Sequence, residues 1–589
     1  ETNGSLKVII LRFTVIFVCI SICFALSVSF QIQEARSFLP AQTRDLSPSI
    51  SDGTISRHQP IDPFQEWVVN STETRENETI VADRIAISRN ISLVLVNCTI
   101  MINSTASNTG NIYSYGILEL RNSTIRALNP AFPYYFYLSS ESTFKATDSL
   151  IRDVGRDVWV VRERGVRLGS KLAILRRTNI TNCVDGLIID TKNPVWLDSC
   201  YIANNNGVGI FVNTQNGNLT VENCVIEGNG AGLFVRPGFL EPESGSSYFA
   251  LQYCNFSSNI LFGLALREAE NATIYRNRFI NHNIGIYVQI SADNNKIEQN
   301  EIISNYNGTG IIIEFGSSDN LIQNNTIRSG DIGINVTSSP NSIIYNQILE
   351  TREMAILVEG CNKGGYISSN QLIISSGVAM KVLDSSFLRV ENNTILSETD
   401  APVIQLEETA NCSFTSNYIS TEGQAFSLID SSNNFFSENT VSETDKSFLL
   451  ANAESKNITF TLFDLTLNGT SLILGSSLKL IPKATLTAEI ASLTLYVNDQ
   501  IFAASNSSNF ELTLDTTDIG GGDIIVIANV IFLNGSAANW TFSLKIQGRP
   551  LGPTKESSEA KWALLAPLIL AMLLMKMGLL KSRRRQLND

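Results

Sequence analysis

Apolar and polar residues alternate over short stretches between about Arg276 and Val441, and one phrase keeps returning there. It consists of an asparagine, any residue and then an apolar residue. The asparagines of this phrase are Asn277, Asn300, Asn325, Asn346, Asn370, Asn393, Asn417 and Asn439. They are spaced by 21–25 residues, a period that is typical of solenoids. A second phrase follows, a turn and a short alternating strand, as in NIGIYV, GTGIII and DIGINV.

Two or three short strands per period, with Asn and Gly at the corners, predict one coil of a parallel β-helix. Neighbouring coils stack at about 4.8 Å, so the same position of each coil lies above its predecessor. An asparagine in a tight corner can bond backbone groups and the asparagines above and below. We therefore expect a buried asparagine ladder with an apolar stack beside it.

The register extends toward the N-terminus with other residues in the ladder position. These are Cys98, Ser123, Asp148, Thr178, Cys200, Cys224 and Cys254. The fold class is thus all-β, with a parallel β-helix over residues 79–452. Longer steps at 152–171 and 236–248 indicate loops that leave the stack, and insertions on one face of a repeat array are often its binding face.

The segments outside the β-helix differ in composition. Residues 453–548 have alternating strands with Gly and Asn turns, and their length suits one Ig-like β-sandwich. Residues 1–30 read as a secretory signal peptide or, alternatively, an uncleaved signal anchor. Residues 562–580 are a candidate transmembrane helix, and the basic tail 581–589 indicates its cytoplasmic end. Residues 31–78 and 549–561 are predicted linkers. The body should therefore lie outside the cell.

The composition excludes some functions. A formal net charge of −13 argues against nucleic-acid binding, which needs a basic surface. Asn-x-Ser/Thr sequons occur about twice as often as this composition gives by chance, and they predict a glycosylated exterior. The predicted sites include Asn70, Asn90, Asn122, Asn218, Asn307, Asn324, Asn335, Asn392 and Asn539.

The cysteines of the ladder are predicted to be small buried hydrophobes rather than disulfides. Cys200, Cys224 and Cys254 occupy one position in successive coils, and the expected spacing of about 4.8 Å is longer than a disulfide allows. A thiolate metal site is the alternative, but no His is in register beside them. We expect no metal and no cofactor.

Candidate catalytic groups are few. Of the two histidines, His58 lies in the predicted linker, and His282 falls at a corner where other coils carry asparagine. We expect His282 to replace a corner asparagine and not to act as a base. Carboxylate pairs are the other enzymatic route. The candidates are Asp153, Asp157, Asp190 and Asp198, with Arg162 and Arg164 nearby.

The repeat resembles those of the pectin-lyase-like right-handed parallel β-helices, including NosD-like and other carbohydrate-binding or sugar-hydrolase repeats. The stretch DTTDIGGGDIIVIANVIFLNG resembles the closing hairpin of bacterial and archaeal Ig-like surface domains, and the C-terminal segment resembles some prokaryotic sorting signals. The predicted membrane anchor and the scarcity of catalytic groups, together with this resemblance, predict a membrane-anchored surface protein that binds envelope or extracellular glycans or has a structural, adhesive role, with self-association or contact with neighbouring surface proteins as a further expectation. The alternatives are a polysaccharide lyase, hydrolase or epimerase, a surface-layer or filament-type assembly protein, and a NosD-like copper-maturation factor.

Overall fold

The computed structural model describes residues 65–547 apart from short gaps, and the chain divides into two compact units. Unit 1 is Glu1–Tyr287 and unit 2 is Val288–Asp589, with the boundary inside strand β28 (Ile284–Gln289). The gaps are residues 106–108, 157–162, 214–217, 237–248, 329, 338, 443–447, 451–457, 462–469, 474–476, 482–489, 506–511, 520 and 534–536.

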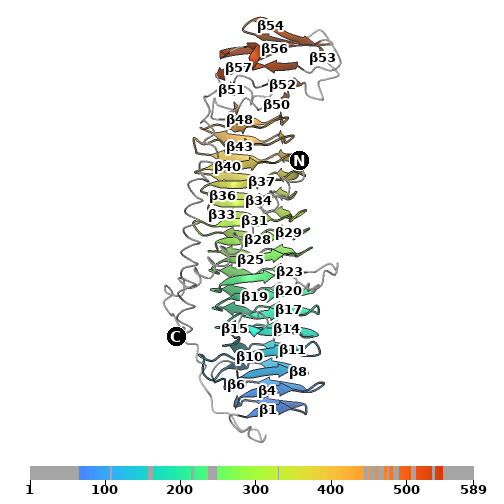
Figure 1. Ribbon diagram of the computed structural model, residues 1–589, viewed down its shortest axis with the longest axis vertical. Coiled ribbons are helices and arrows are strands. Elements are labelled where there is room, and N and C mark those ends of the chain that lie inside the picture. Colours follow the sequence, from blue (N-terminus) through green and yellow to red (C-terminus); the bar gives the residue numbers. More distant parts are fainter. Residues whose placement is uncertain are drawn as a thin grey trace, which may run out of the picture. The chain divides into compact units, whose positions relative to one another are not determined.

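Unit 1 is a stack of coils, each contributing one strand to each of three parallel sheets, A, B and C (Figure 1). Sheet A contains β1 (Glu66–Val69), β4 (Arg84–Ile87), β7 (Asn111–Ser114), β10 (Tyr135–Leu138), β13 (Val166–Leu168), β16 (Leu187–Ile189), β19 (Val208–Val212), β22 (Ala231–Val235) and β25 (Phe262–Arg267). Sheet B contains β2 (Glu73–Glu76), β5 (Ser92–Val96), β8 (Ile117–Arg121), β11 (Thr143–Thr147), β14 (Leu172–Arg176), β17 (Val195–Asp198), β20 (Leu219–Glu222), β23 (Phe249–Gln252) and β26 (Thr273–Tyr275). Sheet C contains β3 (Thr79–Ala82), β6 (Thr99–Ile102), β9 (Thr124–Ala127), β12 (Leu150–Arg152), β15 (Asn179–Thr181), β18 (Tyr201–Ala203), β21 (Val225–Glu227), β24 (Asn255–Ser257) and β27 (Arg278–Ile280).

The coils of unit 2 follow the same order of sheets. Sheet A contains β31 (Thr309–Glu314), β34 (Ile332–Thr337), β37 (Met354–Glu359), β40 (Val378–Leu383), β43 (Ile404–Glu407), β46 (Phe426–Ile429) and β49 (Phe448–Leu450). Sheet B contains β29 (Lys296–Glu298), β32 (Leu321–Gln323), β35 (Ser342–Ile344), β38 (Gly365–Ser368), β41 (Leu388–Glu391), β44 (Ser413–Thr415), β47 (Phe435–Ser437) and β50 (Ile458–Thr461). Sheet C contains β30 (Glu301–Ile303), β33 (Thr326–Arg328), β36 (Gln347–Thr351), β39 (Gln371–Ile374), β42 (Thr394–Ser397), β45 (Tyr418–Thr421) and β48 (Thr440–Ser442).

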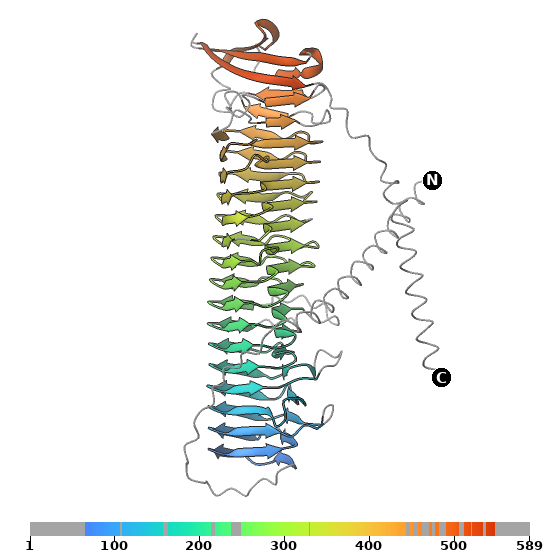
Figure 2. The same ribbon diagram turned by 90° about the vertical axis from the view of Figure 1, so that its left-hand side faces the viewer.

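Apolar side chains stack along the interior because each strand pairs in register with its counterpart in the next coil. In sheet C of unit 1, Ile100 pairs with Ile125, and Ile202 pairs with Ile226. The stack of buried side chains in this sheet is Ile80, Ile100, Ile125, Ile151, Ile180, Ile202, Ile226, Phe256 and Phe279. The repeated apolar position of the sequence is therefore the core of the coil. Figure 2 shows the stacked strands of unit 1, coloured from blue to green, from another side.

The ladder runs along the corner that precedes sheet C. In unit 2 the Nδ2 atom of Asn325 donates to the Oδ1 atom of Asn346 at 3.0 Å, and Asn346 donates to Asn370 at the same distance. The backbone N–H groups of Asn325 and Asn346 also donate to the next asparagine at 2.9 Å. All eight predicted ladder asparagines are at most 3% exposed. The residue before each of them has a φ angle of 53–59°, which turns the chain into the corner.

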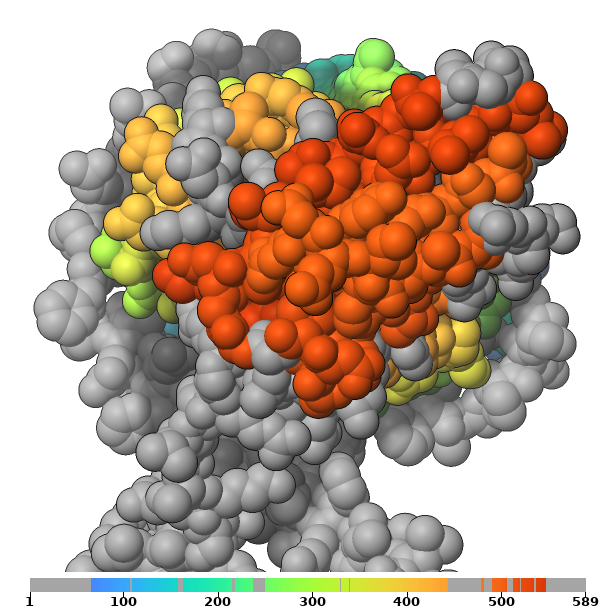
Figure 3. All heavy atoms as spheres, turned by 90° about the horizontal axis from the view of Figure 1, so that it is seen from above, coloured from blue at the N-terminus to red at the C-terminus, as the bar shows by residue number. Residues whose placement is uncertain are grey.

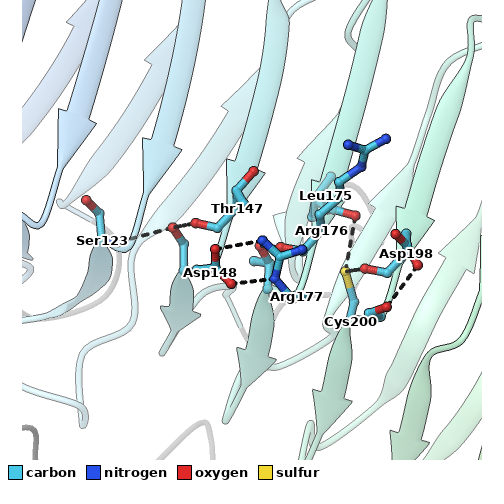
Figure 4. A network of polar contacts seen from close by, with 11 residues as sticks. Ser123, Thr147, Asp148, Leu175, Arg176, Arg177, Asp198 and Cys200 are labelled. Carbon is cyan, nitrogen blue, oxygen red and sulfur yellow. Dashed lines mark hydrogen bonds and ion pairs between the residues drawn. The ribbon is translucent and has the colours of Figure 1, made fainter.

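In unit 1 thiols and hydroxyls take the place of the amide. The N–H groups of Cys200 and Cys224 each donate to the next sulfur, at 3.4 Å. Ser149 and not Asp148 holds the ladder position, because Ser149 is buried and accepts the N–H of Ser123. Asp148 is the outward left-handed corner residue (φ 52°), and it forms an ion pair with Arg177 (Figure 4).

The second repeated phrase, as in GTGIII, forms the start of the sheet A strands. Its glycine lies where the backbones of neighbouring coils approach each other closely. A Cβ atom on Gly209 would lie 2.8 Å from the carbonyl oxygen of Gly232, and one on Gly232 would lie 2.2 Å from that of Gly263. The close approach of the backbone explains why this phrase carries Gly in most coils and Ala in others, such as Ala355 and Ala379.

The strands after residue 453 extend sheets A and B of unit 2. Strand β50 pairs in parallel with β47 and β52 (Ser477–Ile481), and β51 (Thr470–Ile473) pairs in parallel with β49 and β57 (Ala537–Gln547). Antiparallel strands follow, namely β53 (Ile490–Val497), β54 (Gln500–Ser505), β55 (Leu512–Asp515) and β56 (Gly522–Phe532), with the short helix α2 (Thr516–Ile519). Figure 3 looks onto this end of unit 2. Parallel pairing therefore crosses the predicted boundary at residue 453, and an Ig-like sandwich remains a prediction.

The N-terminal boundary also needs correction, because β1 and β2 lie inside the predicted linker 31–78 and pair in parallel with β4 and β5. Sequence alternation missed β2 (ETRE) because its one buried side chain is Arg75, which forms ion pairs with Glu73 and Glu78.

The predicted segments 1–30, 549–561, 562–580 and 581–589 lie outside the described residues. Within the described part of the chain, no helix is long and apolar enough to span a membrane.

Candidate functional site

In the sequence, longer connections join several strands of sheet A of unit 1 to strands of the neighbouring sheets. Residues 128–134 and 153–165 lead from sheet C into β10 and β13, and residues 213–218 and 236–248 lead from β19 and β22 into sheet B. Two of these are the insertions that the sequence indicated. Because repeat arrays often carry their binding residues beside such insertions, the solvent-facing side chains of this sheet form the candidate site.

Three tyrosines from adjacent strands gather on this face. The ring centroids of Tyr113 and Tyr135 are 5.6 Å apart, and those of Tyr113 and Tyr137 are 6.2 Å apart. Tyr135 and Tyr137 are stacked at 6.3 Å. Tyr113 and Tyr137 are half-buried, while Tyr135 is only 7% exposed. Each retains an aromatic body and a hydroxyl group, the combination that suits a partner with both apolar and polar surface.

A guanidinium group connects the tyrosines to a carboxylate. Arg167 lies over the ring of Tyr137 at 4.7 Å and donates to Asp190 Oδ2 from Nε at 2.9 Å and from Nη2 at 2.6 Å. Its Nη1 atom donates to the hydroxyl of Tyr135 at 3.5 Å. Burial raises the pKa of Tyr135, and Arg167 offsets only part of that rise. The phenol therefore stays protonated at neutral pH.

A polar column continues along the same edge of the sheet. Asn213 donates to Asp190 Oδ1 at 3.2 Å. Arg236 and Arg267 follow in the next two coils. They occupy equivalent positions because each comes directly after one member of the register pair Val235 and Leu266. Burial and then the neighbouring charge of Arg267 lower the pKa of Arg236. The strand register therefore places these two arginines at the same position of adjacent coils.

Phenylalanines line the same face beside this column. Phe211 and Phe234 have ring centroids 5.5 Å apart, and Phe234 and Phe262 are 5.8 Å apart, both edge-on. Strand register places Phe211 and Phe234 in the outward row that begins with Tyr113, Tyr137 and Arg167. Aromatic and cationic groups thus share one row of sheet A.

The predicted carboxylates do not converge. Asp190 lies on the candidate face, but Asp153 is buried at 3% exposure at the end of sheet C. Burial raises the pKa of Asp153, and its Oδ1 atom accepts from Arg152 at 3.2 Å. Asp198 ends a strand of sheet B (Figure 4), where its Oδ1 atom accepts from Ser199 and Asn223. Asp157 and Arg162 lie outside the described residues.

The sequence reasoning missed the tyrosines and the arginines of the face. Tyr113, Tyr137 and Arg167 occupy the same outward position in β7 (NIYS), β10 (YFYL) and β13 (VRL). Only the strand register reveals that they share this position. Arg164 was named beside the carboxylates, and it pairs with Asp185 at 2.9 Å. This pair also fixes the corner, because Asp185 Oδ1 accepts the N–H of Val208 at 2.9 Å.

The buried histidine and thiols form no metal site among the described residues, where no group of three or more candidate ligands occurs. His282 is fully buried, and its Nδ1 atom lies 3.0 Å from the carbonyl oxygen of Asn259, in the corner column that contains Asn205 and Asn229. Burial lowers the pKa of His282 and raises that of the Cys183 thiol to about 12. The imidazole of His282 and the thiol of Cys183 are therefore neutral, and they form part of the corners between the strands. The seven cysteines of the described residues are buried, and none of them forms a disulfide with another described cysteine.

The predicted glycosylation sites are mostly accessible. Asn335 is half-buried in β34, and the exposed sites are Asn70, Asn90, Asn122, Asn218, Asn307, Asn324, Asn392 and Asn539. Asn122, Asn324 and Asn392 have φ angles of 46–56° at the corner before sheet C, where asparagine tolerates the left-handed conformation. A threonine then begins the strand, so the repeat itself generates sequons. Part of their excess has this structural cause, and glycosylation remains a prediction.

Comparison with known proteins agrees with this architecture. The family model described as "Right handed beta helix region" matches residues 85–238, 241–372 and 309–465. The chain belongs to the right-handed beta helix family. No curated protein matches this beta-helix chain.

Solved structures with a similar fold include two enzymes. The periplasmic alginate epimerase AlgG is 14% identical, with 56% of this chain and 76% of that chain covered and a TM-score of 0.33. DFA-IIIase from Arthrobacter chlorophenolicus A6, in complex with GF2, is 12% identical, with 57% and 84% covered and a TM-score of 0.30. At these identities the likeness concerns the fold alone.

Proposed function

We propose that this beta-helix protein binds an acidic polysaccharide along sheet A of unit 1. The observation that supports the proposal is the gathering of three tyrosines, Arg167, Arg236 and Arg267 on one solvent-facing sheet between long connections. We place this binding at the cell surface, where residues 562–580 would anchor the chain.

The aromatic groups suit a sugar chain because their rings offer apolar faces while their hydroxyls offer hydrogen bonds. The ring positions are fixed, since Tyr135 and Tyr137 stack on each other and Arg167 covers Tyr137. A rigid aromatic platform loses little conformational entropy when a ligand binds. An extended polysaccharide would follow the row along the stack of coils.

The charges favour an acidic sugar. Asp190 engages Arg167, and the strand register places Arg236 and Arg267 at the same position of adjacent coils. A carboxylate of the sugar chain between these two residues would be attracted by both positive charges, and a guanidinium binds a carboxylate with paired, charge-assisted hydrogen bonds. Glu268 contacts Arg267 at 3.3 Å and its charge also acts on Arg236, so a bound carboxylate would compete with Glu268 at both arginines.

Tyr137→Ala is expected to weaken binding of polygalacturonate about tenfold, because truncating a central aromatic anchor typically costs more than 1 kcal/mol. Affinity electrophoresis or calorimetric titration measures the change. Tyr345→Ala is the matched control, since Tyr345 is 57% exposed on unit 2. Equal affinities of the two variants, or no binding by the native protein, would overturn the proposal.

A second candidate function is an enzyme acting on the same polysaccharide. The contact chain of the Tyr135 hydroxyl, the Arg167 guanidinium and the Asp190 carboxylate favours it, because acid–base chemistry needs such groups held within reach of one bond. Under this alternative the protein releases shortened or modified polygalacturonate, and Asp190→Asn reduces the rate by about 100-fold or more. The binding proposal expects no product from the native protein.

A further inference from the structure

A second row of aromatic side chains lies on sheet B of unit 1, away from the candidate face. Trp196 is 43% exposed and Tyr253 is 48% exposed. Tyr253 contacts Tyr275 edge-on, with ring centroids 5.9 Å apart. Exposed aromatic residues scattered singly need no explanation, but these occur within three coil steps, about 14 Å at strand spacing.

Polar contacts hold this row in place. The indole Nε1 of Trp196 donates to Glu222 Oε1 at 2.9 Å, and Gln252 donates to Glu222 Oε2 at 3.1 Å. Arg176 lies over the ring of Trp196 at 5.6 Å, and Arg276 lies over that of Tyr275 at 5.0 Å. Because both oxygens of Glu222 accept hydrogen bonds, this carboxylate positions its neighbours in adjacent coils.

Small residues lie beside the row. Strand register places Thr220, Ala250 and Thr273 in the three coils after Trp196, at the same position of sheet B. Ala250 is buried, and Thr220 and Thr273 are half-buried and add hydroxyl groups near the projecting indole. An extended sugar chain would run along the sheet B strands of these coils with one face of a sugar ring against the exposed Trp196.

The charges of the row balance. Arg176 and Arg276 oppose Asp198 and Glu222, two charges of each sign. Asp198 accepts hydrogen bonds from Ser199 and Asn223, and Glu222 is engaged as described. This surface thus offers rings and hydrogen-bonding groups without an excess of positive charge, in contrast to the adjacent guanidinium groups of Arg236 and Arg267.

We propose that the sheet B row, centred on Trp196, Gln252, Tyr253 and Tyr275, is a second binding site for an uncharged polysaccharide. It goes beyond the acidic-polysaccharide site on sheet A and does not depend on it. Trp and Tyr are the residues that most often anchor such interfaces. Two sites of different charge preference on two sheets would let one protein hold two kinds of glycan.

The test follows tryptophan fluorescence of the full chain while dextran, xyloglucan and galactomannan, three uncharged polysaccharides, are added in turn. We expect at least one of them to change the emission, with no loss at high salt because the ligand carries no charge. Trp196→Ala should weaken that binding about tenfold, measured by affinity electrophoresis. Tyr253→Ala is a second variant, at a corner residue whose exposure makes unfolding a minor concern.

Tyr137→Ala on sheet A and Tyr345→Ala on unit 2 should bind the uncharged polysaccharide like the native protein. Binding to none of the three, or unchanged binding by both Trp196→Ala and Tyr253→Ala, would overturn the proposal. Loss in Tyr137→Ala alone would also overturn it, because the site would then be sheet A. Polygalacturonate binding is scored separately, so failure of the sheet A proposal is distinguishable.

Discussion

Asn325→Leu is expected to lower the free energy of unfolding by about 1–3 kcal/mol for each buried group it leaves unpaired. The Nδ2 atom of Asn325 donates to the carbonyl of Ile297 at 2.8 Å, and its Oδ1 atom accepts the N–H of Asn300 at 2.9 Å. Leucine can satisfy neither partner. The side chain is 1% exposed, so water cannot replace the lost contacts. Urea unfolding followed by circular dichroism measures the change.

The neighbouring residue supplies a matched control. Asn324 is exposed with a φ angle of 55°, so Asn324→Gly keeps a residue that tolerates this conformation while removing the side chain and the sequon. We expect a change well below that of Asn325→Leu. Equal losses at the two positions would contradict the assignment of Asn325 to the interior ladder.

The ladder could be predicted from sequence because one position carries asparagine in eight successive periods and an apolar residue two positions later. The prediction misplaced Asp148 because TDSLI offers two polar residues next to each other. The structure distinguishes them by backbone conformation: Asp148 is left-handed and outward, and Ser149 is buried. The sequence therefore locates the ladder position to a single residue less well where that residue is not an asparagine.

The candidate site was harder to predict because its residues come from coils that lie far apart in the sequence. Tyr113, Tyr137 and Arg167 share one outward position, yet 24 and 30 residues separate them in the chain, and an insertion lies between the last two. Carboxylates near the insertions were named by sequence proximity. In the structure, Asp153, Asp190 and Asp198 lie at the ends of strands that belong to three different sheets.

Arg236→Gln combined with Arg267→Gln is expected to produce the largest loss of polygalacturonate binding, about 100-fold. The change removes both guanidinium groups of one adjacent pair, and each hydrogen bond to a charged group is worth about 1.5–3 kcal/mol. Both side chains are partly exposed at the sheet edge, so the substitutions should leave the coil intact. Near- and far-ultraviolet circular dichroism provides the check on folding.

The pair of charges also predicts how salt acts. Binding by the native protein should weaken as ionic strength rises, because screening reduces attraction between exposed opposite charges. The double variant should show a smaller dependence on salt. Lys381→Gln is the control, since Lys381 is a partly exposed cation on sheet A of unit 2 that contacts Glu407 at 3.6 Å; its affinity should match that of the native protein.

The most direct test of the account is a calorimetric titration of polygalacturonate into the native protein and into the Arg236→Gln, Arg267→Gln variant at low salt. The account predicts saturable binding by the native protein and a loss of about 100-fold in the variant. No heat of binding to the native protein, or the same affinity in both proteins, would contradict the assignment of an acidic-polysaccharide site to sheet A of unit 1.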